Sequence, residues 1–237
     1  MIYLFGDIHG DADELLYYLR QSSIKPGDTL VLLGDVGLNY RLHHHKDELS
    51  KAQLEKTGIH FLCIHGNHER RPATIPTYHL TEWRGGKAYI EDAYPHLYFA
   101  KDGEVFDLEG RKAIVLGGAY SIDKPYRLMR GWSWFEDEQP SVEIKADVKR
   151  RLDELDWKVD LVLSHTCPAK YIPREAMMSF VDQSTVDRST EDWLDGIEDR
   201  LRYDAWYCGH WHINKRIDRM HFLFHELAWL PEKGEAE

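Results

Sequence analysis

Residues 2–10 read IYLFGDIHG, a run of four apolar side chains followed at once by Asp7 and His9 between two glycines. The apolar run has the length of a strand and ends at a turn-forming glycine. In open α/β sheets, binding sites lie just beyond the carboxyl ends of the strands. This stretch therefore predicts a buried strand that carries a carboxylate and an imidazole to one edge of a sheet.

The same arrangement recurs four more times along the chain. The residues placed just after a strand-length apolar run are Asp7, His9, Asp35, Asn67, His68, His165, His210 and His212, after runs at 2–5, 30–33, 59–64, 160–164 and 204–209. One polar residue after a strand is usually an ordinary turn residue. Five such clusters in one chain indicate a shared site, and His210 and His212, two apart on extended backbone, can face one object.

Helical spacing separates several of these runs and favours an α/β fold. Segments 11–21, 142–157 and 189–202 place apolar residues on one face, the last with Ser189 or Thr190 as its expected N-cap. Strands and helices alternate early and strands cluster in the middle, which favours an α/β sandwich with one mixed sheet or two packed sheets. No repeat or linker divides the chain, so we expect a single domain over 1–237 with a frayed polar tail at 231–237.

Composition excludes several classes of protein. The chain has 237 residues and a formal net charge of −11, which disfavours binding along extended nucleic acid. Three cysteines without CxxC spacing argue against a disulfide framework and suit a reducing compartment. The amino terminus lacks a signal-peptide pattern and no apolar run is long enough to span a bilayer, so we expect a cytoplasmic protein without a membrane partner.

The residue types at the strand ends indicate a transition-metal site. Carboxylate, amide and imidazole ligands without thiolates exclude structural zinc of the four-cysteine type and suit manganese, iron, zinc or cobalt. Seven of the eight side chains at the strand ends, counted without His68, are too many ligands for one ion. Shared between two ions through one bridging carboxylate, they give each ion four protein ligands and leave space for water and substrate.

Five short motifs together resemble the calcineurin-like metallophosphoesterase superfamily. The motifs are GDIHG (6–10), GDVG (34–37), GNHE (66–69), SH (164–165) and GHWH (209–212). The resemblance covers nearly the whole chain and implies a four-layer α/β/β/α sandwich with the metal site at the carboxyl ends of the strands. It also implies a phosphoester hydrolase that uses two divalent ions, manganese being favoured, and a hydroxide that bridges them.

The resemblance also assigns roles to individual residues. It implies that the first ion is held by Asp7, His9 and His212, the second by Asn67, His165 and His210, and that Asp35 bridges them. His68 would lie beside the leaving group as a general acid or as a stabiliser of the transition state. Its side chain diverges from that of the adjacent Asn67 on extended backbone, which supports a role other than that of ligand.

One departure from the resemblance concerns phosphate binding. The branch that includes the serine/threonine protein phosphatases continues its second motif as GDxVDRG, with an aspartate that orients the catalytic histidine and an arginine for phosphate. Leu38 and Asn39 occupy those two positions here. The candidates for phosphate binding elsewhere are Arg41, Arg70, Arg71, Arg127 and Arg130.

The segment 117–141 is rich in aromatic and basic residues and has two interpretations. It is a lid over the metals in which Arg127 or Arg130 contacts phosphate, or it is an ordinary loop or oligomer contact that packs its aromatic rings. The residues of 117–141 fit both interpretations equally.

The sequence therefore predicts a metal-dependent phosphoester hydrolase. A phosphomonoester is favoured because His68 is present to assist a poor leaving group, and the expected substrates are a phosphorylated small molecule, a nucleotide or a phosphopeptide. The alternative is a phosphodiesterase acting on nucleotides or nucleic-acid ends. A distant alternative is a non-catalytic binding scaffold, which the complete ligand set disfavours because clustered polar groups are costly without a metal.

Overall fold

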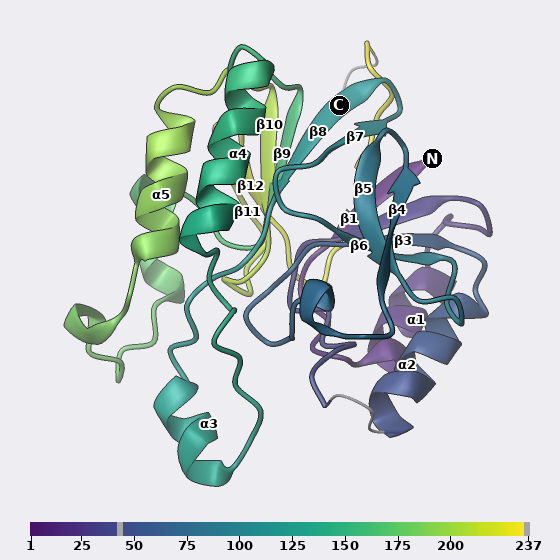
Figure 1. Ribbon diagram of the computed structural model, residues 1–237, viewed down its shortest axis with the longest axis horizontal. Helices are drawn as coiled ribbons and strands as arrows, with labels where there is room; N and C mark the ends of the chain where they lie inside the picture. Colours follow the sequence, from purple (N-terminus) through teal and green to yellow (C-terminus); the bar gives the residue numbers. More distant parts are fainter. Residues whose placement is uncertain (42–44, 235–237) are drawn as a thin grey trace.

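The computed structural model describes residues 1–41 and 45–234, and two β-sheets face each other at its centre (Figure 1). Within this part of the chain, the strand order is β13-β1-β2-β3-β6-β5-β4 in the first sheet and β11-β12-β10-β9-β8-β7 in the second. The first sheet consists of β1 (Ile2–Phe5), β2 (Thr29–Leu32), β3 (His60–Cys63), β4 (His79–Trp83), β5 (Gly86–Ile90), β6 (Leu97–Ala100) and β13 (Ala228–Leu230). The second consists of β7 (Val105–Leu108), β8 (Arg111–Leu116), β9 (Leu161–Ser164), β10 (Ala205–Cys208), β11 (Lys215–Ile217) and β12 (Met220–Phe222).

Helices cover the outer face of each sheet. Figure 1 shows one helix pair beside the first sheet, a second pair beside the other sheet, and α3 projecting away from both. The helices are α1 (Ala12–Arg20) and α2 (His45–Glu55) on the first sheet, α4 (Val142–Glu154) and α5 (Ser189–Glu198) on the second, and the projecting α3 (Lys124–Arg130). Short 3₁₀ turns occur at η1 (Pro72–Thr74), η2 (Ala169–Tyr171), η3 (Arg174–Ala176) and η4 (Gln183–Thr185).

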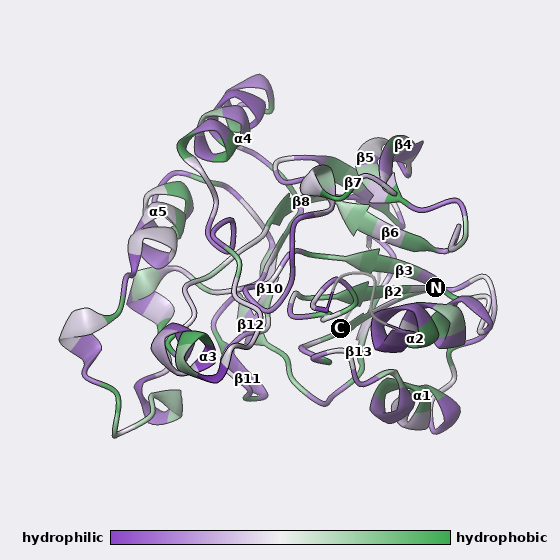
Figure 2. Cartoon of the chain, turned by 60° about the horizontal axis from the view of Figure 1, so that its bottom comes forward, coloured by the Kyte–Doolittle hydropathy of each residue, from purple (hydrophilic) through white to green (hydrophobic). Residues whose placement is uncertain are grey.

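Three separate apolar clusters hold these layers together. Ile2 and Leu4 of β1 belong to the cluster between the two sheets, whereas Tyr3 and Phe5 belong to the cluster under α1 and α2. A third cluster joins the second sheet to α4 and α5. Because the central strands are buried on both faces, most of their residues are apolar on both faces, as Figure 2 shows for their hydropathy. The predicted four-layer sandwich is confirmed.

The strand directions bring the predicted polar clusters to one edge. Strands β1, β2, β3 and β6 run parallel, as do β8, β9, β10 and β12. Antiparallel strands flank each parallel set, so both sheets are mixed. The loops after β1, β2, β3, β9 and β10 therefore leave the sheets on the side where binding sites form.

Helices α1 and α4 begin within one residue of the expected segments 11–21 and 142–157, but the expected cap of α5 is not formed. Asp11 caps α1 by accepting a hydrogen bond from the backbone N–H of Glu14 at 3.0 Å. The expected cap of α5 by Ser189 or Thr190 is wrong: Arg188 holds the N-cap position without a side-chain cap bond. Thr190 lies inside the helix and its hydroxyl bonds to Gln139 at 2.8 Å, so a tertiary contact replaces the capping role.

The polar tail after β13 is described only in part. Residues 231–234 of the predicted frayed tail have neither helix nor strand, and 235–237 lie outside the described residues. The description of 1–237 as a single domain stays a prediction. Among the described residues, no helix combines the length and the apolar character needed to cross a bilayer.

Candidate metal centre

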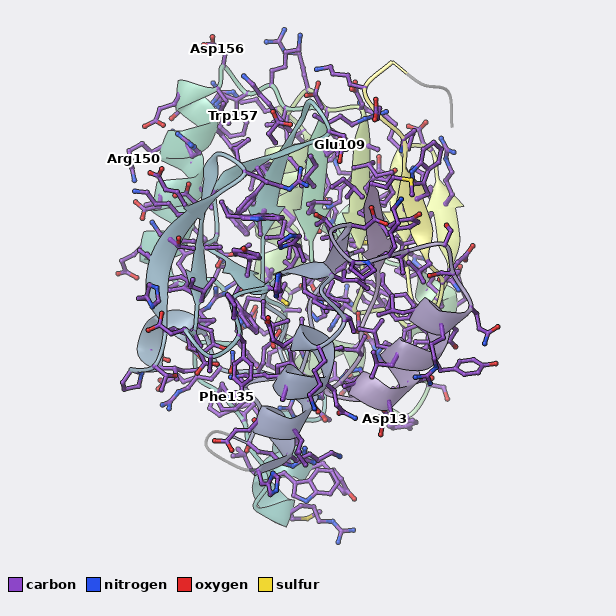
Figure 3. All side chains as sticks on the ribbon, turned by 90° about the vertical axis from the view of Figure 1, so that its right-hand side faces the viewer. Asp13, Glu109, Phe135, Arg150, Asp156 and Trp157 are labelled. Carbon is purple, nitrogen blue, oxygen red and sulfur yellow. The ribbon has the colours of Figure 1, made fainter. Side chains whose placement is uncertain are left out.

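All eight side chains singled out after the strands meet at the carboxyl edge of the two sheets. Hydrogen bonds join the sheets there: the His165 ring contacts the Leu33 carbonyl at 2.9 Å, and the His210 backbone N–H donates to Asp7 at 2.9 Å. Phe135 packs beside this edge through Tyr40, while the turn at Glu109 lies at the opposite end of the molecule (Figure 3). The residues brought together are Asp7, His9, Asp35, Asn67, His68, His165, His210 and His212.

Backbone N–H groups hold both carboxylates in place. Asp35 Oδ1 accepts from the backbone N–H groups of Asn67 at 2.7 Å and His68 at 2.8 Å. Burial acts to raise the pKa of Asp35, but four imidazoles, His165 first among them, lower it far below its usual range. Both Asp7 and Asp35 are almost fully buried, so they need positive charge beside them.

Gly66 and Gly209, which precede the predicted ligands Asn67 and His210, are required by close packing rather than by a turn. A Cβ at Gly66 would lie 2.2 Å from Asp35 Oδ1, and one at Gly209 would lie 2.2 Å from Asp7 Oδ1. These two loops thus pass directly against a predicted ligand that follows a different strand. Glycine is the residue that permits this approach.

Strained backbone occurs in the same loops, as it does at turns elsewhere in the chain such as Arg84 and Asp218. Four of the predicted ligands have positive φ although none is glycine: His9 at 45°, Asp35 at 45°, His210 at 65° and His212 at 51°. This conformation costs free energy for an ordinary residue and persists where the surrounding structure enforces it for a function. The surrounding structure therefore enforces an unfavourable conformation at four neighbouring predicted ligands.

The second half of the cluster places two hydrogen-bond acceptors face to face. Because the Leu33 carbonyl can only accept, His165 Nδ1 carries the hydrogen, and in the neutral ring Nε2 then carries a lone pair. That atom lies 2.8 Å from Asn67 Oδ1. The amide cannot turn its nitrogen inward, since Asn67 Nδ2 donates to Ser121 Oγ at 2.9 Å. A cation between the two acceptors satisfies both.

The first half of the cluster shows the same convergence. His9 Nε2 and His212 Nε2 lie 3.0 Å apart, and His212 Nε2 lies 3.2 Å from Asp7 Oδ2. Asp7, His9 and His212 can each offer one ligand atom within 4.8 Å of the others. This is the set that the resemblance implies for the first ion.

The chemistry of the donors fits divalent cations. Burial, followed by the neighbouring His165, lowers the pKa of His210 to about 3, so that its imidazole is neutral and its nitrogen lone pair is available at neutral pH. His210 Nδ1 lies 3.2 Å from His165 Nε2. With Asp35 between the two halves, the residues present fit two ions.

His68 lies at the margin of the cluster, with different neighbours on its two sides. Its Nε2 is 3.9 Å from Asp35 Oδ2 and 4.0 Å from Asp123 Oδ1. By distance alone, His68 could join His9 and Asp35 as a metal ligand. Two neighbours distinguish it from the predicted ligands: the carboxylate of Asp123, and the ring of Tyr40, whose centroid lies 6.5 Å from that of the His68 ring. Burial lowers its pKa against the opposing effect of the Asp35 carboxylate. Leu38 occupies the position of the aspartate that orients the catalytic histidine in the GDxVDRG pattern. Here a different carboxylate, that of Asp123, lies near the imidazole of His68.

A large cavity opens directly over these side chains. It has a volume of about 690 Å³, within the range of small-molecule sites, and its lining includes His9, Asp35, Asn67, His68, His210 and His212. Segment 117–141 contributes Tyr120, Ile122, Asp123 and Tyr126 to the wall. Whether this segment acts as a lid stays a prediction.

The five candidate arginines do not line this cavity, and their roles in phosphate binding stay predictions. Arg71 is buried, pairs with Asp102 and donates to the Asp137 carbonyl at 2.8 Å. Arg127 is buried and bonds to Asp123 at 2.9 Å and Ser121 at 2.8 Å. Arg130 contacts the Tyr126 hydroxyl at 3.2 Å, while Arg41 and Arg70 are exposed.

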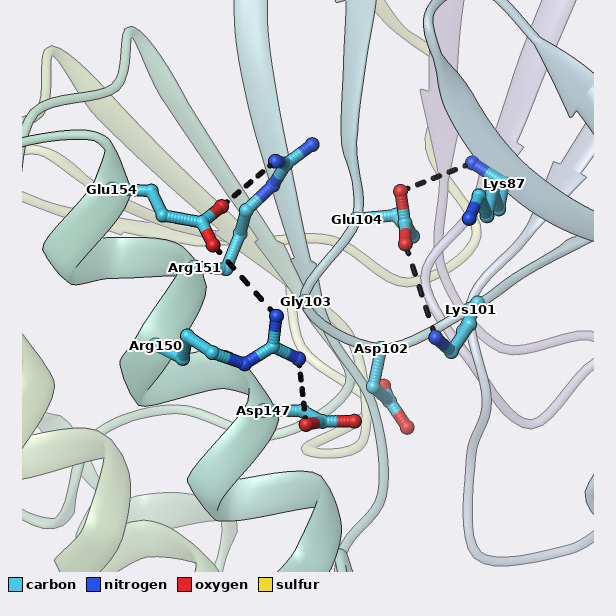
Figure 4. A pocket seen from close by; sticks show the side chains of 9 residues that line it. All are labelled: Lys87, Lys101, Asp102, Gly103, Glu104, Asp147, Arg150, Arg151 and Glu154. Carbon is cyan, nitrogen blue, oxygen red and sulfur yellow. Dashed lines mark hydrogen bonds and ion pairs between the residues drawn. The ribbon is translucent and has the colours of Figure 1, made fainter.

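A second cavity of about 360 Å³ lies between α4 and the loop that follows β6 (Figure 4). Its charges pair with one another: Arg150 bonds to Asp147 at 2.8 Å, Arg151 bonds to Glu154 at 3.1 Å, and Lys101 faces Glu104 at 3.9 Å. It contains none of the predicted ligands. The larger cavity is therefore the candidate active site.

Sequence reasoning missed the part that Glu69 plays. Its buried carboxylate accepts from the backbone N–H groups of Val36 at 3.3 Å, Gly37 at 3.2 Å and Gly66 at 3.1 Å. Burial, with Asp35 nearby, raises the pKa of Glu69 to about 7. Glu69 thus connects the loop of Asp35 to the loop of Asn67. Its place in GNHE was the available signal, but its partners are distant in sequence.

Comparisons with known proteins agree with this geometry. A family model described as calcineurin-like phosphoesterase matches residues 1–214. No curated protein matches the chain significantly. Eight chains of solved structures match it. One of these, a crystal structure, is 13% identical, covers 94% of this chain and 88% of its own, and superimposes with a TM-score of 0.50, a likeness that concerns the fold alone.

Proposed function

The chain belongs to the calcineurin-like phosphoesterase family, and from this premise we propose that it hydrolyses phosphoesters at a centre of two divalent ions. Asp7, His9 and His212 would hold one ion, a second group would hold the other, and Asp35 would be shared. The second group is Asn67, His165 and His210. Manganese is the proposed metal, because carboxylate, amide and imidazole donors suit it.

The observation that carries this proposal is the meeting of His165 Nε2 and Asn67 Oδ1, two acceptors with no hydrogen between them, beside a second close pair of imidazole nitrogens. His165 Nε2 faces Asn67 Oδ1 at 2.8 Å, and His9 Nε2 faces His212 Nε2 at 3.0 Å. When bound, two divalent ions would supply positive charge to a phosphoryl group and lower the pKa of a bound water. The protein keeps the donors fixed through backbone bonds to Asp7 and Asp35.

His68 would serve the leaving group. Its ring lines the cavity beside the ligands, and Asp123 lies 4.0 Å from its Nε2. A ring hydrogen directed at the leaving oxygen would stabilise the charge that develops there, an effect of about 10²–10⁴-fold. We propose His68 as the catalytic residue that donates this hydrogen.

A phosphodiester is the second candidate substrate, and the charge of the cavity favours it. Among the lining residues that the structure describes, Arg188 is the one lysine or arginine, while Asp123, Asp187 and Glu191 are acidic. A diester carries one negative charge and needs fewer cations than a dianionic monoester. His68 supports hydrolysis of either ester, so the proposal covers both.

The test compares p-nitrophenyl phosphate with bis-p-nitrophenyl phosphate, because the two share one leaving group. Protein stripped with chelator and restored with Mn²⁺ should hydrolyse at least one of them, and Asp35→Asn should not. A faster monoester reaction identifies a phosphatase, and a faster diester reaction a phosphodiesterase. Absence of metal-dependent hydrolysis of both would contradict the proposal and favour a binding scaffold.

The cellular location is proposed on the state of the thiols. Cys63, Cys167 and Cys208 are free and buried, and burial raises the pKa of each thiol. Such thiols suit a reducing cytoplasm.

A further inference from the structure

The cavity over the candidate metal centre extends beyond its polar floor to an apolar wall. One wall comes from the chain between β9 and α5, which we call the apolar wall: Ile172, Met177, Met178, Phe180, Val181 and Val186. Tyr120, Ile122 and Tyr126 line the cavity from the segment that leads into α3. Figures 1 and 2 both show these two segments on the same side of the molecule, away from the sheets.

The chain that carries the apolar wall has the form of a binding loop. Between the end of β9 at Ser164 and the start of α5 at Ser189 it contains only 3₁₀ turns. Loops of this length inside a compact fold are usually functional. Lys170 anchors one end to Asp199 at 2.5 Å, and Gln139 anchors the other to Asp187 at 3.0 Å.

Large apolar side chains of this loop face solvent at the cavity instead of entering a core. Phe180 is 83% exposed and Met178 is 48% exposed, yet both line the cavity with the metal-centre residues. Grouped exposed apolar residues mark a binding surface, and methionine adapts to ligands of varied shape. Because the polar floor would hold a phosphoryl group, the remainder of the same substrate would reach the apolar wall.

The charged residues that line the cavity limit the charge of the substrate's non-phosphoryl part. Asp123, Asp187 and Glu191 line it, and Arg188 is partly engaged with Gln183 at 3.3 Å. A substituent with a further negative charge, such as a second phosphate or a carboxylate, would be repelled. An uncharged apolar substituent would bury its surface against Met177, Met178 and Phe180 without an opposing charge.

We propose that the substrates are phosphoesters with an extended, uncharged apolar substituent, which the apolar wall binds while the phosphoryl group lies at the polar floor. This inference rests on the proposed function and specifies its substrate class. Phosphorylated sugars and free phosphate have little apolar surface with which to contact the apolar wall. The wall acts in binding, and the residues at the floor act in the reaction.

The test measures how affinity depends on chain length, using methyl-, butyl- and hexylphosphonate, which are not hydrolysed. Their inhibition constants against the faster p-nitrophenyl ester, and their dissociation constants by calorimetry, are determined with Mn²⁺-loaded protein. Each methylene group that is fully buried on binding should tighten the dissociation constant about fourfold. Because the wall is open to solvent on one side, we expect at least about tenfold tighter binding from methyl to hexyl. Equal binding of all three would overturn the inference.

Matched variants locate the effect. Met178→Ser and Phe180→Ser should remove most of the dependence on chain length, while Met129→Ser should keep it. Met129 is 73% exposed on α3 and does not line the cavity, so it undergoes the same chemical change elsewhere. A dependence that survives both wall substitutions would overturn the assignment to the wall.

The outcomes separate this inference from the proposed function. Hydrolysis with flat phosphonate binding contradicts the inference alone. If no ester is hydrolysed, the proposed function fails, and calorimetry still decides whether the wall binds apolar chains. Sedimentation of Phe180→Ser covers another occupant: a dimer that this substitution converts to a monomer would assign the wall to a second copy of the chain and overturn the inference.

Discussion

At Gly209 the backbone passes so close to a ligand that any side chain would collide with it. A Cβ there would meet Asp7 Oδ1 at 2.2 Å and the Leu33 carbonyl oxygen at 2.9 Å. We predict that Gly209→Ala displaces Asp7, costs about 1–3 kcal/mol of stability and weakens metal binding. Calorimetric titration with Mn²⁺ and thermal unfolding measure both effects.

Gly196 is the matched control for that substitution. It lies inside α5, with no atom within 4 Å of an added Cβ. Gly196→Ala should stabilise the protein by about 0.5–1 kcal/mol through the unfolded chain and leave metal binding unchanged. Equal metal affinity in the two alanine variants would show that the approach of Gly209 to Asp7 is not needed.

Glu69 gives a graded prediction at the same scale. Glu69→Ala leaves three backbone N–H groups without their acceptor, whereas Glu69→Gln retains an oxygen for Val36 and Gly66 and loses the bond to Gly37. Each buried unsatisfied donor costs about 1–3 kcal/mol. Urea unfolding should therefore rank wild type above the glutamine variant and that above the alanine variant. An alanine variant as stable as the glutamine variant would contradict the bonding described.

Residue identities after the strands were predictable because the chemistry is local in sequence. A carboxylate or imidazole directly after an apolar run must lie at the strand end, so the meeting of Asp7 with His210 followed from topology. Contacts of Asp123 with His68, and of Arg188 with the cavity, were not predictable. Both residues come from loops whose path depends on packing rather than on a local pattern.

At the scale of elements, an ion pair joins α2 to the end of β5. Lys51 Nζ lies 2.5 Å from Glu91 Oε2, and both side chains are largely enclosed. Burial acts to raise the pKa of Glu91, but the hydrogen bond from Lys51 and its neighbours outweighs it and lowers the pKa overall. Because the folded pKa is below the unfolded one, the pair stabilises above about pH 4.5 and loses this effect as the pH falls.

Glu91→Gln should therefore destabilise the protein by about 1–3 kcal/mol at pH 7, because the enclosed Lys51 loses its charged hydrogen-bond partner, and by progressively less below about pH 4.5. Urea unfolding of both proteins at several pH values measures the difference. Glu82→Gln, on the exposed face of β4, serves as the control and should change stability little at any pH. A difference for Glu91→Gln that stays constant down to pH 3 would contradict the assigned ion pair.

Central strands were readable from the sequence and peripheral strands were not. The runs at 2–5, 30–33, 59–64, 160–164 and 204–209 correspond to β1, β2, β3, β9 and β10 within one residue at each end. These strands are buried on both faces, so their apolar character is continuous. By contrast, β4 reads HLTEW and is mostly exposed, so pairing with β5 and not apolar periodicity defines it.

At the scale of the whole molecule, the candidate metal centre draws its side chains from both sheets. Asp7, Asp35 and Asn67 come from the first sheet, and His165 and His210 from the second. A ligand that binds only the folded state stabilises it by about 2.7 kcal/mol at a hundredfold excess over its dissociation constant. Mn²⁺ should therefore raise the melting temperature by roughly 5–10 °C, and chelator should reverse the shift. An unchanged melting temperature would contradict a metal centre built from both sheets.

The most direct test of the account is the number of Mn²⁺ ions bound per chain, measured by calorimetry and elemental analysis for wild type and Asp35→Asn. Asparagine keeps the oxygen that accepts from Asn67 and His68 and removes the shared charge. Exposed Asp192 supplies the control Asp192→Asn. We expect two ions in wild type and the control, with loss of at least one in Asp35→Asn. One ion or none in wild type, or two in Asp35→Asn with unchanged affinity, would contradict a centre in which Asp35 is shared.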